Sequence, residues 1–312
     1  MTGSLAEYRP LIIKSMRPRQ WIKNFLIFPA MVFAGRFFDF SYFALTSAGF
    51  AVFCLLAGSI YLYNDIQDME KDKEHPTKKL RPIASGQLPV DVAMRAMKIA
   101  FVLAWIGAII IGLISASLHD AVSGKGAFGF FFICVVYFLL HVTYSKWLKH
   151  VVIIDVGVIA FGFVLRVMAG GAITGLTISP WIIICTTLLA LFLGFGKRRH
   201  EIMLLADEAT GHRKILEEYS PYFLDQMISV VTASTVVAYS LYTMDADTVA
   251  KLGTDKLTWT IPFVLYGIFR YLYLVHQREE GGSPSRILLT DKPLLVDIAA
   301  WFATVLLILY VT

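Results

Sequence analysis

Residues 58–86 read GSIYLYNDIQDMEKDKEHPTKKLRPIASG, and a strongly apolar stretch ends inside them. The apolar run SIYLY passes directly into Asp65, Asp68 and Asp72, and a loop rich in Lys, Pro and Gly follows. Ionisable side chains are costly in a hydrophobic span and commonly functional there. The stretch therefore predicts a membrane helix that delivers carboxylates to one surface of the bilayer.

The composition of the whole chain agrees with this reading of one segment. Of 312 residues, 57% are hydrophobic and 16% are charged, and the mean hydropathy is +0.66. A soluble domain has about 45–50% apolar and about 25% charged residues. The composition excludes a soluble enzyme, a disordered tail and a disulfide scaffold, and it indicates a polytopic membrane protein.

Apolar stretches long enough to cross a bilayer recur along the chain with short polar breaks. We predict an all-α protein with about nine spans that form a single transmembrane domain over residues 1–312. The first span is short, and Pro29 is expected to kink or interrupt it. The longest polar breaks, 65–91 and 197–224, are expected to cap a site. The predicted spans are 21–36, 42–64, 92–116, 127–144, 151–171, 180–196, 225–243, 258–276 and 294–311.

The basic residues sort to one side of these spans. Of the 28 Lys and Arg residues, 22 precede the first span or lie at alternate breaks. The positive-inside rule makes that side cytoplasmic. We therefore expect a multi-pass protein of the cell (inner) membrane with a cytoplasmic N-terminus and active site, and no cleaved signal peptide. The net charge of +5 then reflects topology and is not evidence for a nucleic-acid partner.

The acidic residues at the end of the second span share one helical stripe. At about 100° per residue, Asp65, Asp68 and Asp72 fall within about 60° of one another. Three carboxylates on one stripe repel one another unless a cation lies between them, and hard oxygen ligands of this kind suit Mg²⁺ with phosphate oxygens. The stripe predicts a Mg²⁺ site and the catalytic centre. A solvated acidic helix end is the alternative.

Cations surround this stripe. Lys78, Lys79 and Arg81 lie in a Pro- and Gly-punctuated loop, and Lys197 and Arg198 close the sixth span. Such side chains can hold the phosphates of a substrate, although topology or anionic lipid also explains them. The other candidate substrate contacts, which could instead be interfacial anchors, are Arg19, Lys23, Asn24, Asn64, Tyr144 and Lys149.

Three further ionisable residues lie within predicted spans. Asp155 near the inner end of the fifth span is expected to support the site, and Arg270 in the eighth span is a candidate to face it. Arg166 lies near the outer end of the fifth span, where snorkelling to the membrane surface would explain it.

NDxxDxxxD at 64–72, followed by HPTKKLRPIASG at 75–86, resembles the first aspartate-rich motif of the UbiA superfamily of intramembrane prenyltransferases. The resemblance extends over nearly the whole chain. It implies about nine helices around a cytoplasm-facing cavity and Mg²⁺ that binds a diphosphate.

Other segments resemble the decaprenyl-phosphate phosphoribosyltransferase branch of that superfamily. They are RPRQWIKN at 17–24, YSKWLKH at 144–150, GKRRHE at 196–201 and EYS at 218–220. This resemblance implies transfer of 5-phosphoribose from phosphoribosyl pyrophosphate (PRPP) to decaprenyl or another polyprenyl phosphate, with release of diphosphate, for cell-wall arabinan precursors. It implies PRPP, the lipid phosphate and the membrane as partners, and a homo-oligomer is possible.

The loop between the sixth and seventh predicted spans favours phosphoribosyl transfer over prenyl transfer. It has no second D-x-x-x-D and begins with three cations, which suits a reaction that holds several phosphates. A prenyltransferase that moves a polyprenyl chain from its diphosphate to an aromatic or quinone-precursor acceptor is the alternative enzyme. A transporter is disfavoured because the charges gather at one face and do not cross the membrane.

Overall fold

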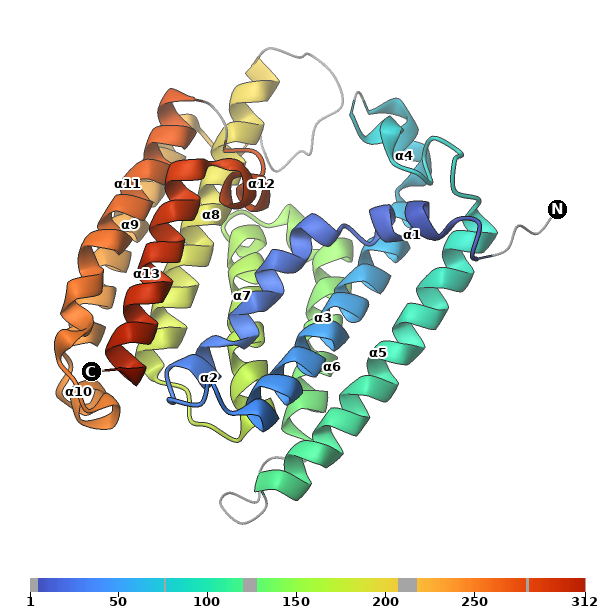
Figure 1. Cartoon of the computed structure of the whole chain (residues 1–312). Coiled ribbons are helices and arrows are strands. Elements are labelled where there is room, and N and C mark those ends of the chain that lie inside the picture. The colour runs from blue at the N-terminus through green and yellow to red at the C-terminus, as the bar shows by residue number, and fades with distance from the viewer. Residues whose placement is uncertain (1–4, 76, 120–127, 207–217, 279–280, 312) are drawn as a thin grey trace.

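The structure is a computed structural model that describes residues 5–75, 77–119, 128–206, 218–278 and 281–311. Helices make up the regular structure of these residues (Figure 1). The long helices are α3 (Phe40–Gln67), α5 (Val90–His119), α6 (Gly129–Lys146), α7 (Ile154–Thr174), α8 (Pro180–Ala206), α9 (Pro221–Met244), α11 (Ile261–Gln277) and α13 (Lys292–Tyr310).

Eight helices in the described part of the chain are long and apolar enough to cross a membrane. Their outer surfaces carry many exposed Leu, Ile, Val and Phe side chains, as expected for a protein whose solvent is lipid. The prediction of an all-α polytopic membrane protein is confirmed. The predicted count of nine differs by one, because the first expected span is not a single helix.

The segment predicted to span at 21–36 is broken in two. It forms a 3₁₀ helix, η1 (Pro18–Ile27), and one short turn of α-helix, α2 (Pro29–Val32). Each piece has proline at its start, where the missing N–H is tolerated, whereas Pro29 cannot continue the backbone ladder of η1. The predicted interruption at Pro29 is therefore confirmed, and η1 crosses the bundle beside α7 (Figure 1).

The short helices mark the two ends of the bundle. At one end lie α1 (Arg9–Ser15), α4 (Met69–Glu74) and α12 (Pro284–Thr290) (Figure 1). We call this the aspartate end, because α3 ends there and Asp65 lies in its last turn. At the opposite end lie α2 and α10 (Ala246–Leu252) (Figure 1). The remaining 3₁₀ turns are η2 (Lys78–Leu80), η3 (Leu148–His150) and η5 (Lys256–Thr260).

The buried core is built from apolar side chains of the long helices. One cluster joins α3, α6 and α7 through residues such as Phe53, Phe130 and Tyr137. Another joins α8, α9 and α11 through residues such as Phe192 and Tyr271. Because α7 and α8 pack together, the two clusters hold the helices that carry the site residues in one frame.

A glycine sets how closely η1 approaches α7. A Cβ atom built on Gly170 of α7 would lie 2.0 Å from the backbone oxygen of Ile27. Real Cβ atoms do not approach backbone so closely, and η1 could accommodate one only by moving. Small residues allow such close backbone contact between helices in membranes.

Gly170→Ala is expected to destabilise the protein by about 1–3 kcal/mol or more, the usual cost of overpacking. The control is Gly157→Ala in the same helix, where nothing lies within 4 Å of the added methyl. Thermal unfolding of both variants in detergent measures the effect. Equal melting temperatures for the two variants would show that the contact with Ile27 is not restrictive.

Candidate functional site

Two buried aspartates at the aspartate end share one arginine nitrogen. Asp65 and Asp72 are 2% and 4% exposed. Arg81 Nη1 donates to Asp65 Oδ1 at 3.1 Å and to Asp72 Oδ2 at 2.5 Å. Arg17 Nη2 also donates to Asp65 Oδ1, at 2.5 Å. The predicted repulsion between the carboxylates is thus relieved by a cation between them, which in this structure is a guanidinium.

A break in the helix brings these carboxylates together. The residue that caps α3 is Asp68, which also precedes α4, and its backbone leaves helical geometry with φ −90° and ψ 4°. The sequence predicted that the three aspartates lie on one continuous helix. This prediction is wrong, because Asp68 separates α3 from α4. The side chain of Asp68 is half-buried, and no hydrogen bond or ion pair to it is found among the described residues.

The loop after α4 is held so that Arg81 reaches inward. Ile83 and Leu88 are buried at its far side, and the Leu88 N–H donates to the Pro82 oxygen at 2.8 Å. His75 Nδ1 accepts from the N–H of Lys78 at 3.4 Å. Lys79 is exposed, whereas Arg81 of the same loop contacts both aspartates.

The donor chemistry at this point fits a hard divalent cation. No group of three His, Cys, Asp or Glu side chains among the described residues is arranged to hold a metal. However, two carboxylates converge on a position that a cationic nitrogen occupies. Mg²⁺ commonly takes only one or two carboxylates, with waters and substrate phosphates as its other ligands. Asp65 and Asp72 are therefore sufficient for such a site if Arg81 moves toward the phosphates.

A second buried ion pair lies where α7 begins and α8 ends. Asp155 is fully buried and Arg198 is 1% exposed. Arg198 Nε donates to Asp155 Oδ2 at 2.6 Å, Nη1 donates to Glu201, and Nη2 reaches the Tyr144 hydroxyl at 3.3 Å. Asp155 thereby links α7 to α8, and its expected support of the site stays a prediction. The predicted phosphate contact by Arg198 stays a prediction, because its guanidinium faces protein carboxylates.

Tyr219, just before α9, completes this pair. Its hydroxyl donates to Asp155 Oδ1 at 2.8 Å and accepts from the Ile153 N–H at 2.6 Å. Burial raises the pKa of Tyr219, and its bond to the Asp155 carboxylate also raises it, so the phenol stays protonated and can donate. Ile153 adopts φ +68°, a rare conformation for a β-branched residue, and this turn aims its N–H at Tyr219.

Arg166 is placed differently from the expectation of snorkelling. It is 4% exposed and points into the bundle: Nε donates to Asn24 Oδ1 at 2.7 Å, Nη1 to the Gly162 oxygen at 2.6 Å and Nη2 to the Tyr137 hydroxyl at 2.7 Å. Aromatic packing and these three acceptors hold it inside. The predicted site residue Asn24 is thereby a buried partner of Arg166, and its amide reaches Cys54 Sγ at 3.2 Å.

The remaining predicted site residues lie around these groups. Lys23 Nζ lies 5.7 Å from the ring centre of Phe163, and Lys197 pairs with Glu201 at 3.5 Å. Asn64 accepts a hydrogen bond from Ser145 at 3.3 Å. Arg19 is exposed and Lys149 is half-buried, and neither contacts the aspartates among the described residues.

Sequence reasoning missed Arg17, Glu201 and Tyr219 as members of the site. Arg17 stands in left-handed geometry with φ +55° directly before Pro18, and this strained turn directs its side chain back to Asp65. Strained non-glycine residues occur preferentially at functional sites. The RPRQ and EYS segments carried the signal, but only tertiary contacts identify which of their residues is used.

Arg270 does not face the site. Its guanidinium makes a two-point pair with Asp291, with Nε to Oδ1 at 3.1 Å and Nη2 to Oδ2 at 2.8 Å. Asp291 also caps α13 through the Leu294 N–H at 2.9 Å. Arg270 lowers the pKa of Asp291, mainly through these hydrogen bonds. The expectation that Arg270 lines the site is wrong, because the pair fastens α11 to the start of α13.

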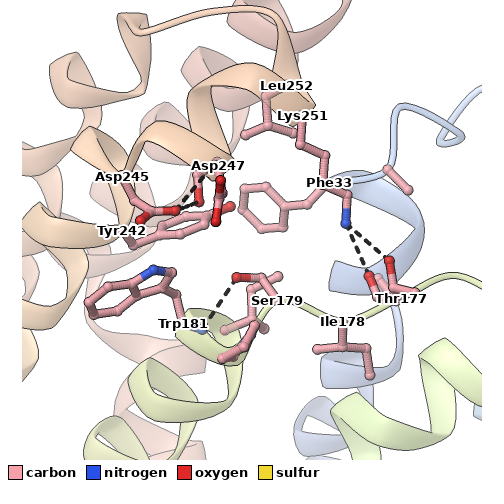
Figure 2. Close-up of a pocket in the computed structure, with 15 residues that line it drawn as sticks. Phe33, Thr177, Ile178, Ser179, Trp181, Tyr242, Asp245, Asp247, Lys251 and Leu252 are labelled. Carbon is pink, nitrogen blue, oxygen red and sulfur yellow. Dashed lines mark hydrogen bonds between the residues drawn. The ribbon is translucent and has the colours of Figure 1, made fainter.

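A pocket of about 370 Å³ lies at the opposite end of the bundle (Figure 2). Phe33, Tyr242 and Trp181 form apolar walls. Two of its polar side chains have structural partners: Lys251 Nζ donates to the Thr177 oxygen at 3.2 Å (Figure 2), and Asp245 caps α10. This pocket is remote from the buried aspartates and does not add to their chemistry.

Asp155→Asn is expected to destabilise the protein by about 3–5 kcal/mol, because it removes a carboxylate from the buried Arg198. The matched control is Asp225→Asn, since the carboxylate that pairs with Arg199 is 37% exposed and such pairs contribute about 1 kcal/mol or less. Denaturation in detergent compares the two. Similar losses for both variants would contradict a special role for the buried pair.

Comparison with known proteins agrees with this architecture. A relative from Corynebacterium glutamicum, decaprenyl-phosphate phosphoribosyltransferase, is 35% identical, and the match covers 96% of this chain and 87% of the relative. A protein of the same name from Mycolicibacterium smegmatis is 33% identical, with 94% and 91% covered.

Solved structures match the fold. A UbiA homologue from Archaeoglobus fulgidus bound to GPP and Mg²⁺ aligns with a TM-score of 0.66 at 18% identity, covering 96% of this chain and all of that one. The family model described as the UbiA prenyltransferase family matches residues 24–290. With its helical bundle and paired aspartates, this chain belongs to the UbiA prenyltransferase family.

Proposed function

We propose that this protein transfers 5-phosphoribose from PRPP to decaprenyl or another polyprenyl phosphate and releases diphosphate. The observation that carries the proposal is the arrangement at the aspartate end: two carboxylates share one cation, and further cations stand nearby. Relatives that match over nearly the whole chain bear the name of this activity.

The residues after the sixth span also support phosphoribosyl transfer. In place of a second D-x-x-x-D, the chain has Lys197, Arg198 and Arg199 at the end of α8. PRPP and a lipid phosphate together bring three phosphate-bearing ends to one site. Cationic side chains favour the binding of these phosphates, whereas additional carboxylates would need additional metal ions to offset their charge. The segment 207–217 of the predicted cap lies outside the described residues.

We propose Mg²⁺ at Asp65 and Asp72, with Asp68 near enough in sequence to bind through water. When bound, the ion would neutralise the diphosphate and favour its departure from the ribosyl carbon. Arg17 and Arg81 already face this position and would bind the diphosphate oxygens. The polyprenyl phosphate is anionic at neutral pH, so its attack needs no general base, and the protein acts by positioning and electrostatics.

The proposed orientation places the aspartate end in the cytoplasm. Most Lys and Arg residues in the loops belong to this end, and positive charge accumulates on the cytoplasmic side of membrane proteins. PRPP is a charged, water-soluble donor, so it would enter from that side, while the isoprenoid chain of the acceptor remains in the lipid. We propose that residues 1–312 act as one transmembrane unit in the cell membrane.

Asp65→Asn is expected to lower kcat by at least about 100-fold, because it removes a preorganised charge at the proposed metal position. The assay gives purified protein labelled PRPP, decaprenyl phosphate and Mg²⁺, and measures lipid-linked phosphoribose. Asp91→Asn is the control, since Asp91 is exposed and pairs with Arg95 on the helix surface. Full activity of Asp65→Asn would refute the assignment of the site.

Removal of divalent ions by EDTA is expected to abolish transfer, and added Mg²⁺ to restore it, because the diphosphate leaving group needs its charge neutralised. Isothermal titration of Mg²⁺ with diphosphate should show binding to the wild type and at least about tenfold weaker binding to Asp72→Asn. The proposed reaction would be overturned if the wild-type protein does not use PRPP and instead transfers the polyprenyl chain of a polyprenyl diphosphate to an aromatic acid.

A further inference from the structure

Arg166 carries a buried charge that has no carboxylate partner among the described residues. Its three hydrogen-bond acceptors are the Asn24 amide oxygen, the Gly162 carbonyl and the Tyr137 hydroxyl, all of which are neutral. It lies about 18 Å along α7 from the first residue of that helix, deep in the span. Charges at such depth are rare and usually serve substrates or ions.

Other buried or partly buried arginines of this chain form ion pairs with carboxylates. In the described residues, Arg81 pairs with two aspartates, Arg198 with Asp155 and Glu201, and Arg199 with Asp225. A buried cation normally has its counter-ion within the protein, because an unpaired one costs several kcal/mol. The missing counter-ion of Arg166 therefore points to one that comes from outside.

Lys23 extends this positive region toward the aspartate end. It forms no ion pair with a carboxylate among the described residues. Lys23 and Asn24 are neighbours on η1, so the same 3₁₀ helix carries the ammonium group and the amide that holds Arg166. Lys23 Nζ and the guanidinium carbon of Arg166 lie 5.7 Å and 5.8 Å from the ring centre of Phe163, so the two cations flank the same aromatic side chain.

A buried polar atom without a partner lies close to Arg166. Gly162 has no side chain there: a Cβ atom on it would lie 3.7 Å from Arg166 Nη1 and 3.9 Å from His141 Nε2. His141 Nε2 is buried without a hydrogen-bond partner among the described residues. Buried polar atoms usually have hydrogen-bond partners. A bound ligand could supply the partner that His141 Nε2 lacks.

We infer that Lys23 and Arg166 form a subsite for a phosphomonoester, separate from the carboxylate site of the diphosphate. Two cations match a phosphate that carries nearly two negative charges, and a guanidinium can bind two of its oxygens. A diphosphate with its metal would bind at Asp65 and Asp72 instead. This inference rests on the proposed function, which supplies two such groups: the 5-phosphate of PRPP and the phosphate of the polyprenyl acceptor.

Binding without turnover tests the subsite independently of the reaction. Ribose 5-phosphate and farnesyl phosphate each present a phosphomonoester without a diphosphate. At least one is expected to raise the melting temperature of the wild-type protein in detergent. Lys23→Ala is expected to weaken that binding at least about tenfold, whereas Lys23→Arg, Asp65→Asn and the exposed-lysine control Lys146→Ala retain it.

Steady-state kinetics then identify which phosphate binds. If the subsite holds the 5-phosphate, Lys23→Ala raises KM for PRPP at least about tenfold and leaves KM for decaprenyl phosphate nearly unchanged. If it holds the lipid phosphate, the two KM values respond the other way round. Arg166→Gln should give the same pattern where it folds, and Lys23→Ala keeps the test available where it does not, because Lys23 is only half-buried.

The outcomes separate this inference from the function on which it rests. Unchanged KM values together with unchanged phosphomonoester binding in Lys23→Ala would overturn the subsite even if phosphoribose is transferred. Equal loss of ribose 5-phosphate and farnesyl phosphate binding in Asp65→Asn would also overturn it, because the sites would then be one. Binding that depends on Lys23 in a protein that does not use PRPP would refute the reaction and support the subsite.

Discussion

The need to compensate charge inside a membrane protein governs this structure. Arg81 places one nitrogen between Asp65 and Asp72, and two buried carboxylates side by side repel each other unless a cation lies between them. The end of α3, the position of α4 and the path of the loop to Ile83 all serve this contact. A divalent ion with a bound diphosphate would satisfy the same constraint with different charges.

Breaks in regular helices bring the charged groups to their positions. Asp68 separates α3 from α4, and Pro18 and Pro29 divide the first predicted span into η1 and α2. A proline removes a backbone N–H donor, and an interrupted helix is tolerated within a membrane only where protein covers the chain. At Ile27, two residues before Pro29, the close contact with Gly170 provides such cover, because it lets η1 lie directly on α7.

Much of the fold and part of the site could be predicted from sequence. Hydrophobic runs predicted the long helices because lipid demands continuous apolar length, and Asp65 and Asp72 were identified because carboxylates are unusual at the end of such a run. The role of Arg166 could not be predicted. Its partner Asn24 is 142 residues away, and no local pattern states whether an arginine turns toward the membrane surface or into the bundle.

The sequence by itself determined the membrane class of the protein, its helical content and the gathering of opposite charges at one end, since these depend on composition and spacing. Tertiary structure alone decided which charges neutralise one another. Arg17, Arg81 and Arg198 form ion pairs with carboxylates of the protein. Arg166 donates hydrogen bonds to neutral groups instead. The physical reason is that electrostatic pairing depends on distances of a few ångströms between helices, which spacing along one chain does not specify.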